Sequence, residues 1–216
     1  MQLVDPTSPA FLFIFVLIGV PFVAGVLYLF WCAVAMRWHR VGWYNLALYM
    51  SVGFLVAVYT ESIHDYVYRA FTGQFLWIYH VWPIFGGASS GLAFVTWPFY
   101  GFHAYFLIKT LDRYSVRLPT WGKGLLSAID GVPFDMLANA GAQFFFGVYF
   151  FFYPRDVLWH LSDWWVMPFY AVSGIIYAYA LHLLFAQPRD WRIPAVCYAL
   201  GVAGMLIGEY YFIRFA

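Results

Sequence analysis

Acidic and imidazole side chains recur within apolar stretches of this sequence, where an ionisable group is costly unless it is buried, paired or functional. Glu61, His64, Asp65 and Tyr68 are spaced i, i+3, i+4 and i+7, so on a helix they share one face. In an apolar pocket a carboxylic acid stays protonated near neutral pH and can deliver its proton. We therefore expect Glu61 to donate a proton or stabilise a positive charge, with Asp65 and His64 assisting. The alternative is an interfacial ion pair with Arg69.

Four further polar residues lie in or beside apolar stretches. Glu209 is expected at a depth similar to Glu61 and is another candidate acid, with an ion pair at the membrane interface as the alternative. Asp135 is placed in the first turn of a helix, where the helix dipole favours negative charge, and Asn139 one turn later extends a polar stripe. His103 lies well inside an apolar stretch and is interpreted as a hydrogen-bonded packing residue.

The spacing of Glu61 and His64 also matches one half of a di-iron site in a helical bundle. Such a site needs a second Glu-x-x-His motif, which the sequence lacks, and histidine boxes are absent as well. A haem would need two axial ligands at matched depth, whereas only His103 is well inside an apolar stretch. The sequence therefore predicts no metal and no cofactor, and a metal- or haem-dependent oxidoreductase is kept as an alternative.

The composition indicates what kind of scaffold must position these groups. Of 216 residues, 64% are hydrophobic and only 10% are charged, against about 25% charged in a typical soluble domain. Six apolar stretches are long enough to cross about 30 Å of hydrocarbon as helices. We therefore expect a single all-α domain, a polytopic transmembrane bundle of about six helices, without an internal repeat. The predicted spans are 11–36, 42–62, 88–109, 131–153, 164–187 and 194–213.

Basic residues are concentrated in every second connection between the predicted spans, and therefore on one side of the membrane. With six spans, one side of the membrane holds 8 of the 11 Lys and Arg residues, and the positive-inside rule makes that side cytoplasmic. Both termini are then expected on the non-cytoplasmic side. A net charge of +1 gives no basic field for nucleic acid. The eight basic residues are Arg37, Arg40, Lys109, Arg113, Arg117, Lys123, Arg189 and Arg192.

Spans one to five resemble the emopamil-binding family of sterol isomerases and the related small integral-membrane terpene cyclases. In residues 58–65 (VYTESIHD) an acid, Glu61, lies near the end of the second span, as in the sterol isomerases. Residues 96–103 (TWPFYGFH), running on to Arg113, look like that family's aromatic third span with its basic exit. The fourth span, a short polar loop and an aromatic fifth span follow the same layout.

The sequence also departs from that family's pattern. The isomerases carry a second acid in the third span, whereas residues 88–108 here contain none. Their Asn and Trp in the fifth span have no counterpart, since Ser173 and Tyr177 stand in that region. A sixth span bearing Glu209 is additional. The second acid would then come from Glu209 or Asp135.

The resemblance implies an enzyme that isomerises or cyclises a sterol, terpenoid or carotenoid-like lipid. It would protonate an alkene, hold the carbocation between aromatic rings and carboxylates, and then remove a proton. A non-enzymatic subunit that binds lipid, pigment or a partner protein is the alternative. Membrane lipids are expected partners, and a homo-oligomer is left open. Residues expected to line the substrate site are Tyr68, Trp97, Tyr100, His103, Asp135, Asn139 and Tyr177.

Overall fold

Six long helices form the chain in this computed structural model, which describes residues 8–215 apart from the side chains at positions 9, 12, 145, 146 and 215. The prediction of an all-α helical bundle is confirmed. The first helix is continuous and contains α1 (Pro9–Ile14), a π-helical stretch (Phe15–Gly19) and α2 (Val20–Val34). The others are α3 (Trp43–Thr72), α4 (Ala93–Arg113), α5 (Thr120–Phe146), α6 (Val166–Phe185) and α7 (Arg192–Phe215).

Four of these helices are long and apolar enough to cross a membrane, which makes the chain a membrane protein. α4 and α5 are also long, and they contain charged residues that include Lys109, Lys123, Asp130 and Asp135. The four apolar helices are Phe15–Val34, Trp43–Thr72, Val166–Phe185 and Arg192–Arg214.

Several helix boundaries differ from the sequence-based expectation, two of them by about ten residues. α3 continues to Thr72 instead of ending near residue 62, and Gly73, with a φ of 80°, ends it in the left-handed region. α5 begins at Thr120 instead of near residue 131. Asp135 therefore does not lie in the first turn of this helix, so the helix-dipole interpretation of Asp135 is wrong. Acidic residues near the expected helix ends, Glu61 and Asp65 in α3 and Asp135 in α5, are instead buried within these helices.

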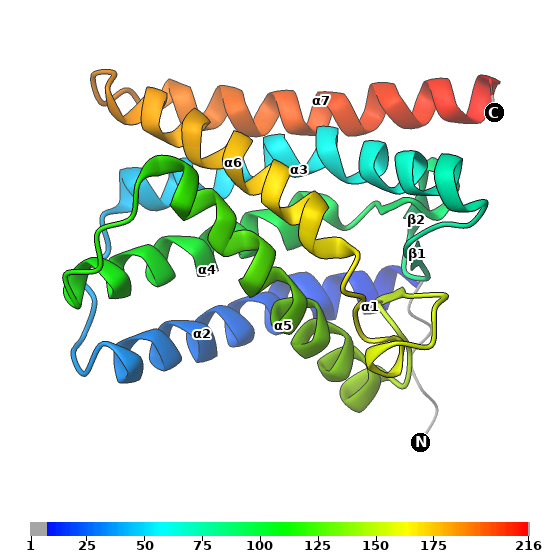
Figure 1. The fold of residues 1–216 in the computed structure, drawn as a ribbon, viewed down its shortest axis with the longest axis horizontal. Helices are drawn as coiled ribbons and strands as arrows, with labels where there is room; N and C mark the ends of the chain where they lie inside the picture. Colours follow the sequence, from blue (N-terminus) through cyan, green and yellow to red (C-terminus); the bar gives the residue numbers. More distant parts are fainter. Residues whose placement is uncertain (1–7, 216) are drawn as a thin grey trace.

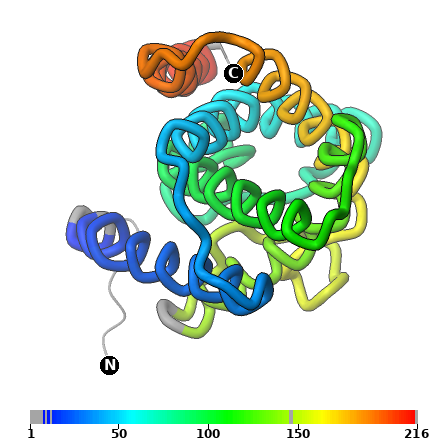
Figure 2. The backbone as a smooth tube through the Cα atoms, turned by 90° about the vertical axis from the view of Figure 1, so that its left-hand side faces the viewer, coloured from blue at the N-terminus to red at the C-terminus, as the bar shows by residue number. Residues whose placement is uncertain are grey.

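The helices alternate in direction, so their connections gather at two ends of the bundle (Figure 1). We call the end with connections 35–42, 114–119 and 186–191 the basic end, and the end with connections 73–92 and 147–165 the ladder end. The start of α1 and the end of α7 both lie toward the ladder end (Figure 1). Seen along the bundle, α3, α4, α5 and α6 form a ring, while α2 and α7 lie outside it (Figure 2). α2 packs on α4, and α7 packs on α3.

Short strands lie in the two connections of the ladder end. β1 (Ile78–Tyr79) pairs antiparallel with β4 (Phe151–Phe152), which joins the two connections to each other. β2 (Pro83–Ile84) pairs with β3 (Ser89–Ser90) within the first connection. Two single turns of 3-10 helix accompany them, at Phe85–Gly87 and Leu158–His160.

The bundle contains a repeat, which corrects the expectation of none. The hydroxyl of Tyr79 donates to Glu61, and that of Tyr153 donates to Asp135. The backbone N–H of residue 77 donates to the side chain at 65, and that of residue 151 donates to the side chain at 139. Four pairs of corresponding residues are each 74 positions apart: Glu61 and Asp135, Asp65 and Asn139, Trp77 and Phe151, and Tyr79 and Tyr153.

The strand ladder gives the symmetry that relates the two halves. Ile78 pairs directly with Phe152, also 74 positions along the chain, so a pseudo-twofold axis passes between them. Since α3 and α5 both run from the basic end to the ladder end, the repeat is parallel and its axis follows the bundle. The repeated unit is a helical hairpin: α3 and α4 form the first hairpin, and α5 and α6 the second.

Glycines allow close approach of the helices within each hairpin. A Cβ atom on Gly101 of α4 would lie 2.4 Å from the Tyr49 carbonyl oxygen of α3. A Cβ atom on Gly174 of α6 would lie 2.3 Å from the Gly124 carbonyl oxygen of α5. These contacts leave no room for a side chain, so each hairpin crosses backbone against backbone.

Candidate acid pair

Glu61 is buried on α3, with 5% of its surface exposed, and its carboxylate is held by side chains alone. One oxygen accepts a hydrogen bond from the Tyr79 hydroxyl. The other accepts from the Ser89 hydroxyl at 2.6 Å and from the Trp97 indole N–H at 3.3 Å. Two of these donors come from the first connection of the ladder end and one from α4, so the first hairpin encloses its own acid.

Asp135 occupies the corresponding position on α5 and is 4% exposed. The Tyr153 hydroxyl donates to one oxygen at 2.6 Å, and the Tyr170 hydroxyl lies 2.8 and 3.0 Å from the two oxygens. Tyr153 comes from the second connection and Tyr170 from α6. The second hairpin therefore repeats the arrangement around Glu61, with tyrosines as donors.

The two carboxylates lie close enough to influence the same group. Burial holds the pKa of the Tyr79 hydroxyl well above its usual range, and the charge of Glu61 and then that of Asp135 raise it further. Burial and the charge of Asp135 act on the pKa of Tyr153 in the same direction. Both hydroxyls thus stay protonated donors, and Glu61 and Asp135 flank the β1–β4 ladder as an acid pair.

Asp65 and Glu209 have a different environment, because they accept hydrogen bonds from backbone. Asp65 is fully buried and accepts the N–H groups of Leu76 at 2.7 Å and Trp77 at 3.4 Å. Glu209 on α7 accepts the N–H of Phe85 at 2.6 Å. Glu61, Asp65 and Glu209 therefore all contact the first connection. Only Glu61 forms no hydrogen bond with the backbone of that connection.

Asn139 plays the part of Asp65 in the second hairpin. Its side-chain oxygen accepts the N–H of Phe151 at 3.2 Å, and its amide donates to the Leu161 carbonyl at 2.9 Å. It is fully buried and both of its polar atoms are bonded. One oxygen of Asp65, in contrast, has no hydrogen-bond partner among the described residues.

The remaining residues of the predicted helical face divide between two environments. His64 is half-buried, stacks on Phe169 with ring centroids 4.8 Å apart, and lies 3.4 Å from the Ser173 hydroxyl. Tyr68 is buried in an apolar cluster that also contains Trp77. These contacts fix α3 against α6 and the ladder end.

The interfacial ion pairs considered from sequence are not formed. Arg69 lies over the Phe75 ring, 4.5 Å from its centroid, and Arg214 donates to the Tyr210 hydroxyl at 2.5 Å. Within residues 8–215, neither arginine forms a salt bridge with Glu61 or Glu209.

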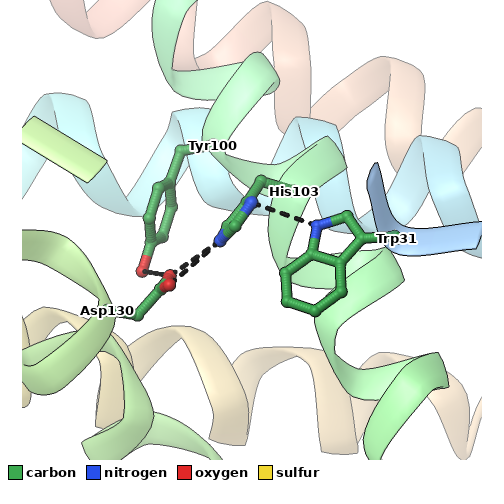
Figure 3. A network of polar contacts seen from close by, with 4 residues as sticks. All are labelled: Trp31, Tyr100, His103 and Asp130. Carbon is green, nitrogen blue, oxygen red and sulfur yellow. Dashed lines mark hydrogen bonds and ion pairs between the residues drawn. The ribbon is translucent and has the colours of Figure 1, made fainter. Parts of the chain in front are cut away.

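His103 belongs to a second polar network, which links α2, α4 and α5 (Figure 3). The Trp31 indole N–H lies 3.3 Å from Nδ1 of His103, and Nε2 of His103 lies 2.9 Å from Asp130. An indole nitrogen can only donate, so Nδ1 must accept. Nε2 therefore carries the hydrogen and donates a hydrogen bond to Asp130. The Tyr100 hydroxyl completes the network at 3.4 Å from Asp130.

Two predicted aromatic residues line a cavity elsewhere in the bundle. Tyr100 and Tyr177 contribute to a space of about 120 Å³ that opens toward the basic end. Glu61, Asp65 and Glu209 do not line it. The structure thus separates the predicted site into an acid pair near the ladder end and a cavity near the basic end.

The sequence did not indicate several of the residues that donate hydrogen bonds to the acid pair. Tyr79, Ser89, Tyr153 and Tyr170 donate to the carboxylates, yet they lie in or beside connections that give no periodic signal. The repeated spacing of 74 residues could have indicated Tyr153 once Tyr79 was known. No cluster of three or more His, Cys, Asp and Glu residues that could hold a metal occurs in the described part of the chain. The absence of a bound metal stays a prediction.

Comparisons of this chain with protein-family models, with curated proteins and with solved structures find no match. The resemblance to the emopamil-binding family therefore stays a prediction.

Proposed function

We propose that the protein is an integral-membrane enzyme that isomerises or cyclises an isoprenoid lipid by acid–base chemistry at Glu61 and Asp135. The observation that carries this proposal is the acid pair itself. Two buried carboxylates from corresponding positions of the two hairpins flank one ladder, and each is held only by side-chain donors. Asp65 and Asn139 accept the hydrogen bonds from the backbone of the two connections, so Glu61 and Asp135 are not needed to anchor these connections.

The proposed reaction needs one acid and one base in a site without water. A protonated carboxyl of the pair transfers its proton to an alkene carbon, which leaves a carbocation on the neighbouring carbon. The other member, as a carboxylate, removes a proton from an adjacent carbon and restores a double bond. One proton enters and one leaves, so no oxidant or cofactor is consumed. The rings of Trp97 and Tyr170, beside the two carboxylates, can stabilise the cation through their π faces.

This assignment selects Asp135 as the partner of Glu61. Glu209 lies on α7, outside the ring of four helices, and accepts from the backbone of the first connection. Asp135 lies on a ring helix and shares the electrostatic environment of Tyr79 with Glu61. Asp65 and Glu209 are then positioning residues, which hold the segment that carries Tyr79 and Ser89.

Deuterium incorporation tests the reaction whichever product forms. The purified protein in detergent would be incubated in heavy water with sterols, linear polyprenes and the lipids that copurify with it. Acid–base isomerisation adds deuterium to carbon, which mass spectrometry detects. Glu61→Gln should lower incorporation about 10²-fold or more, because the amide cannot donate a carboxylic proton. Glu209→Gln is the matched control and should retain most activity. Full incorporation by a folded Glu61→Gln protein would remove the acid pair from the mechanism.

One observation favours a non-enzymatic binding subunit as the second candidate. Every oxygen of Glu61 and Asp135 already accepts a hydrogen bond from the chain. Such saturated carboxylates would serve to join helices, and the protein would bind its lipid unchanged. In heavy water, a copurified lipid that never gains deuterium would support this function over the enzyme.

We also propose that the basic end faces the cytoplasm, because it carries the excess of Lys and Arg. The acid pair would then lie in the non-cytoplasmic half. Arg117→Cys at the basic end and Asp156→Cys at the ladder end are matched positions, since both side chains are exposed. In intact cells, an impermeant thiol reagent should label position 156 only. Labelling at 117 alone would reverse the orientation.

A further inference from the structure

The cavity near the basic end is a feature that the acid pair does not use. Its lining comes from all four helices of the ring, including Tyr49 of α3, Tyr100 of α4, Ser127 of α5 and Tyr177 of α6. It therefore lies within the ring that Figure 2 shows from the basic end. Its volume is about 120 Å³, slightly less than the ~150 Å³ of an engineered cavity that accommodates benzene. A hydrocarbon group of about five carbon atoms fits such a space.

The floor of this cavity is aromatic, and two of its hydroxyl groups are already bonded within the protein. The Tyr177 hydroxyl donates to the Tyr49 carbonyl at 2.8 Å, and the Tyr100 hydroxyl lies 3.4 Å from Asp130. An occupant therefore meets mainly ring faces there. The walls add aliphatic surface from Ala104, Leu107, Ile108, Leu126, Ala178 and Leu181. This interior favours an apolar, branched or unsaturated group.

The mouth of the cavity is polar and carries a cation. Thr120, Lys123 and His182 line it at the basic end. Lys123 is half-buried, and no salt bridge of the described residues involves it. A partly buried ammonium group without a carboxylate partner favours an anion from outside the chain.

We propose that this cavity binds a small anionic amphiphile, with a branched or unsaturated group of about five carbon atoms on the tyrosine floor and a phosphate or carboxylate at Lys123. The apolar volume sets the size of the tail, and the ammonium group of Lys123 sets the charge of the head. The inference does not depend on the proposed acid–base reaction, because no residue of the acid pair lines the cavity.

Binding of 3-methylbut-2-enyl phosphate to the full-length protein in neutral detergent tests the proposal. Calorimetric titration should show saturable binding at one site. Inorganic phosphate, which lacks the tail, and 3-methylbut-2-en-1-ol, which lacks the charge, should each bind about tenfold or more weakly. A lysophosphatidic acid provides the lipid source of the same chemistry. Tighter binding of this lipid would identify a membrane lipid as the occupant, whereas preference for the prenyl phosphate would identify a free metabolite.

Two variants and a matched control decide whether the cavity is the site. Lys123→Met should weaken binding of the anionic amphiphile about tenfold or more, and Ala178→Phe should abolish it by filling the cavity. Arg117→Met removes an exposed cation of the same end and should leave affinity unchanged. The proposal is overturned if none of the amphiphiles binds, if Lys123→Met binds like the wild type, or if Arg117→Met weakens binding equally. Retention of binding by Glu61→Gln would separate this site from the acid pair.

Discussion

The two helical hairpins share one design but differ at the residue that anchors each connection. In the first hairpin an acid, Asp65, accepts backbone N–H groups next to Glu61, and one of its oxygens has no partner in the part of the chain that the structure describes. In the second, the amide of Asn139 accepts one N–H and also donates to a carbonyl, so both of its polar atoms are bonded. At these two corresponding positions the first hairpin therefore holds two carboxylates, Glu61 and Asp65, and the second holds one, Asp135.

This difference distinguishes two roles of polar residues: the proposed acid–base chemistry and the anchoring of a connection through its backbone N–H groups. Glu61 and Asp135 are carboxylates in both hairpins and take bonds only from side chains. The anchoring position can be an acid or an amide, because what it must supply is an acceptor for backbone N–H groups. A carboxylate is thus retained in both hairpins only at the position that we propose for chemistry.

The largest expected effect comes from Asp135→Asn. Asparagine keeps the size of the side chain and can still accept from Tyr153 and Tyr170, but it cannot exchange a proton. If both hairpins contribute to one reaction, deuterium incorporation should fall about 10²-fold or more, as for Glu61→Gln. The double variant should lose little beyond the worse single variant, because the two groups act in one step. Normal activity of Asp135→Asn would show that the hairpins are not equivalent in function.

The next effect is on stability, and it contrasts the two anchoring positions. Asn139→Asp loses the donor to Leu161 and buries a second charge near Asp135, so we expect a loss of about 3 kcal/mol. Asp65→Asn keeps the acceptor and should change stability by only about 0–1 kcal/mol. Unfolding in detergent, followed by tryptophan fluorescence, would measure both. Equal losses would contradict the difference drawn between Asp65 and Asn139.

The glycine crossings should be similarly sensitive in the two hairpins. Gly101→Ala and Gly174→Ala each place a methyl group against backbone and should cost about 1–3 kcal/mol by forcing helices apart. Gly25→Ala on α2 is the control, since its Cβ atom would meet nothing within 4 Å. The same unfolding measurement applies. A neutral Gly174→Ala variant would mean that the second hairpin adjusts where the first cannot.

The smallest effects concern the bonds that join one hairpin to the other. His103 of α4 bonds Asp130 of α5, and Tyr177 of α6 bonds the Tyr49 carbonyl of α3. His103→Phe leaves the Trp31 indole N–H without its acceptor and Asp130 with Tyr100 alone, so it should cost about 2 kcal/mol, whereas Tyr177→Phe should cost about 1 kcal/mol. Thermal melting of the two variants in one detergent compares them. A larger loss for Tyr177→Phe would reverse their order.

The sequence determined the helical membrane architecture of this protein. Apolar stretches are a local property, so six helices and the clustering of basic residues at one end follow from composition and spacing. The burial of Glu61 was also predictable, because an ionisable group in an apolar helix is seldom left facing lipid. Helix ends were less predictable, since Glu61 and Asp130 look like terminal residues but lie inside α3 and α5.

Only the tertiary structure decided which polar groups meet. Asp130 finds His103 on another helix, and Asp135 finds Tyr153 and Tyr170 far along the chain. The repeat escaped the sequence because, of the four pairs of corresponding residues named above, only Tyr79 and Tyr153 are identical, while the residue type changes in the other three pairs. Hydrogen bonding needs an acceptor or a donor at a given place, and several side chains can provide it. The pairing of the two hairpins therefore depends on geometry that composition and spacing do not encode.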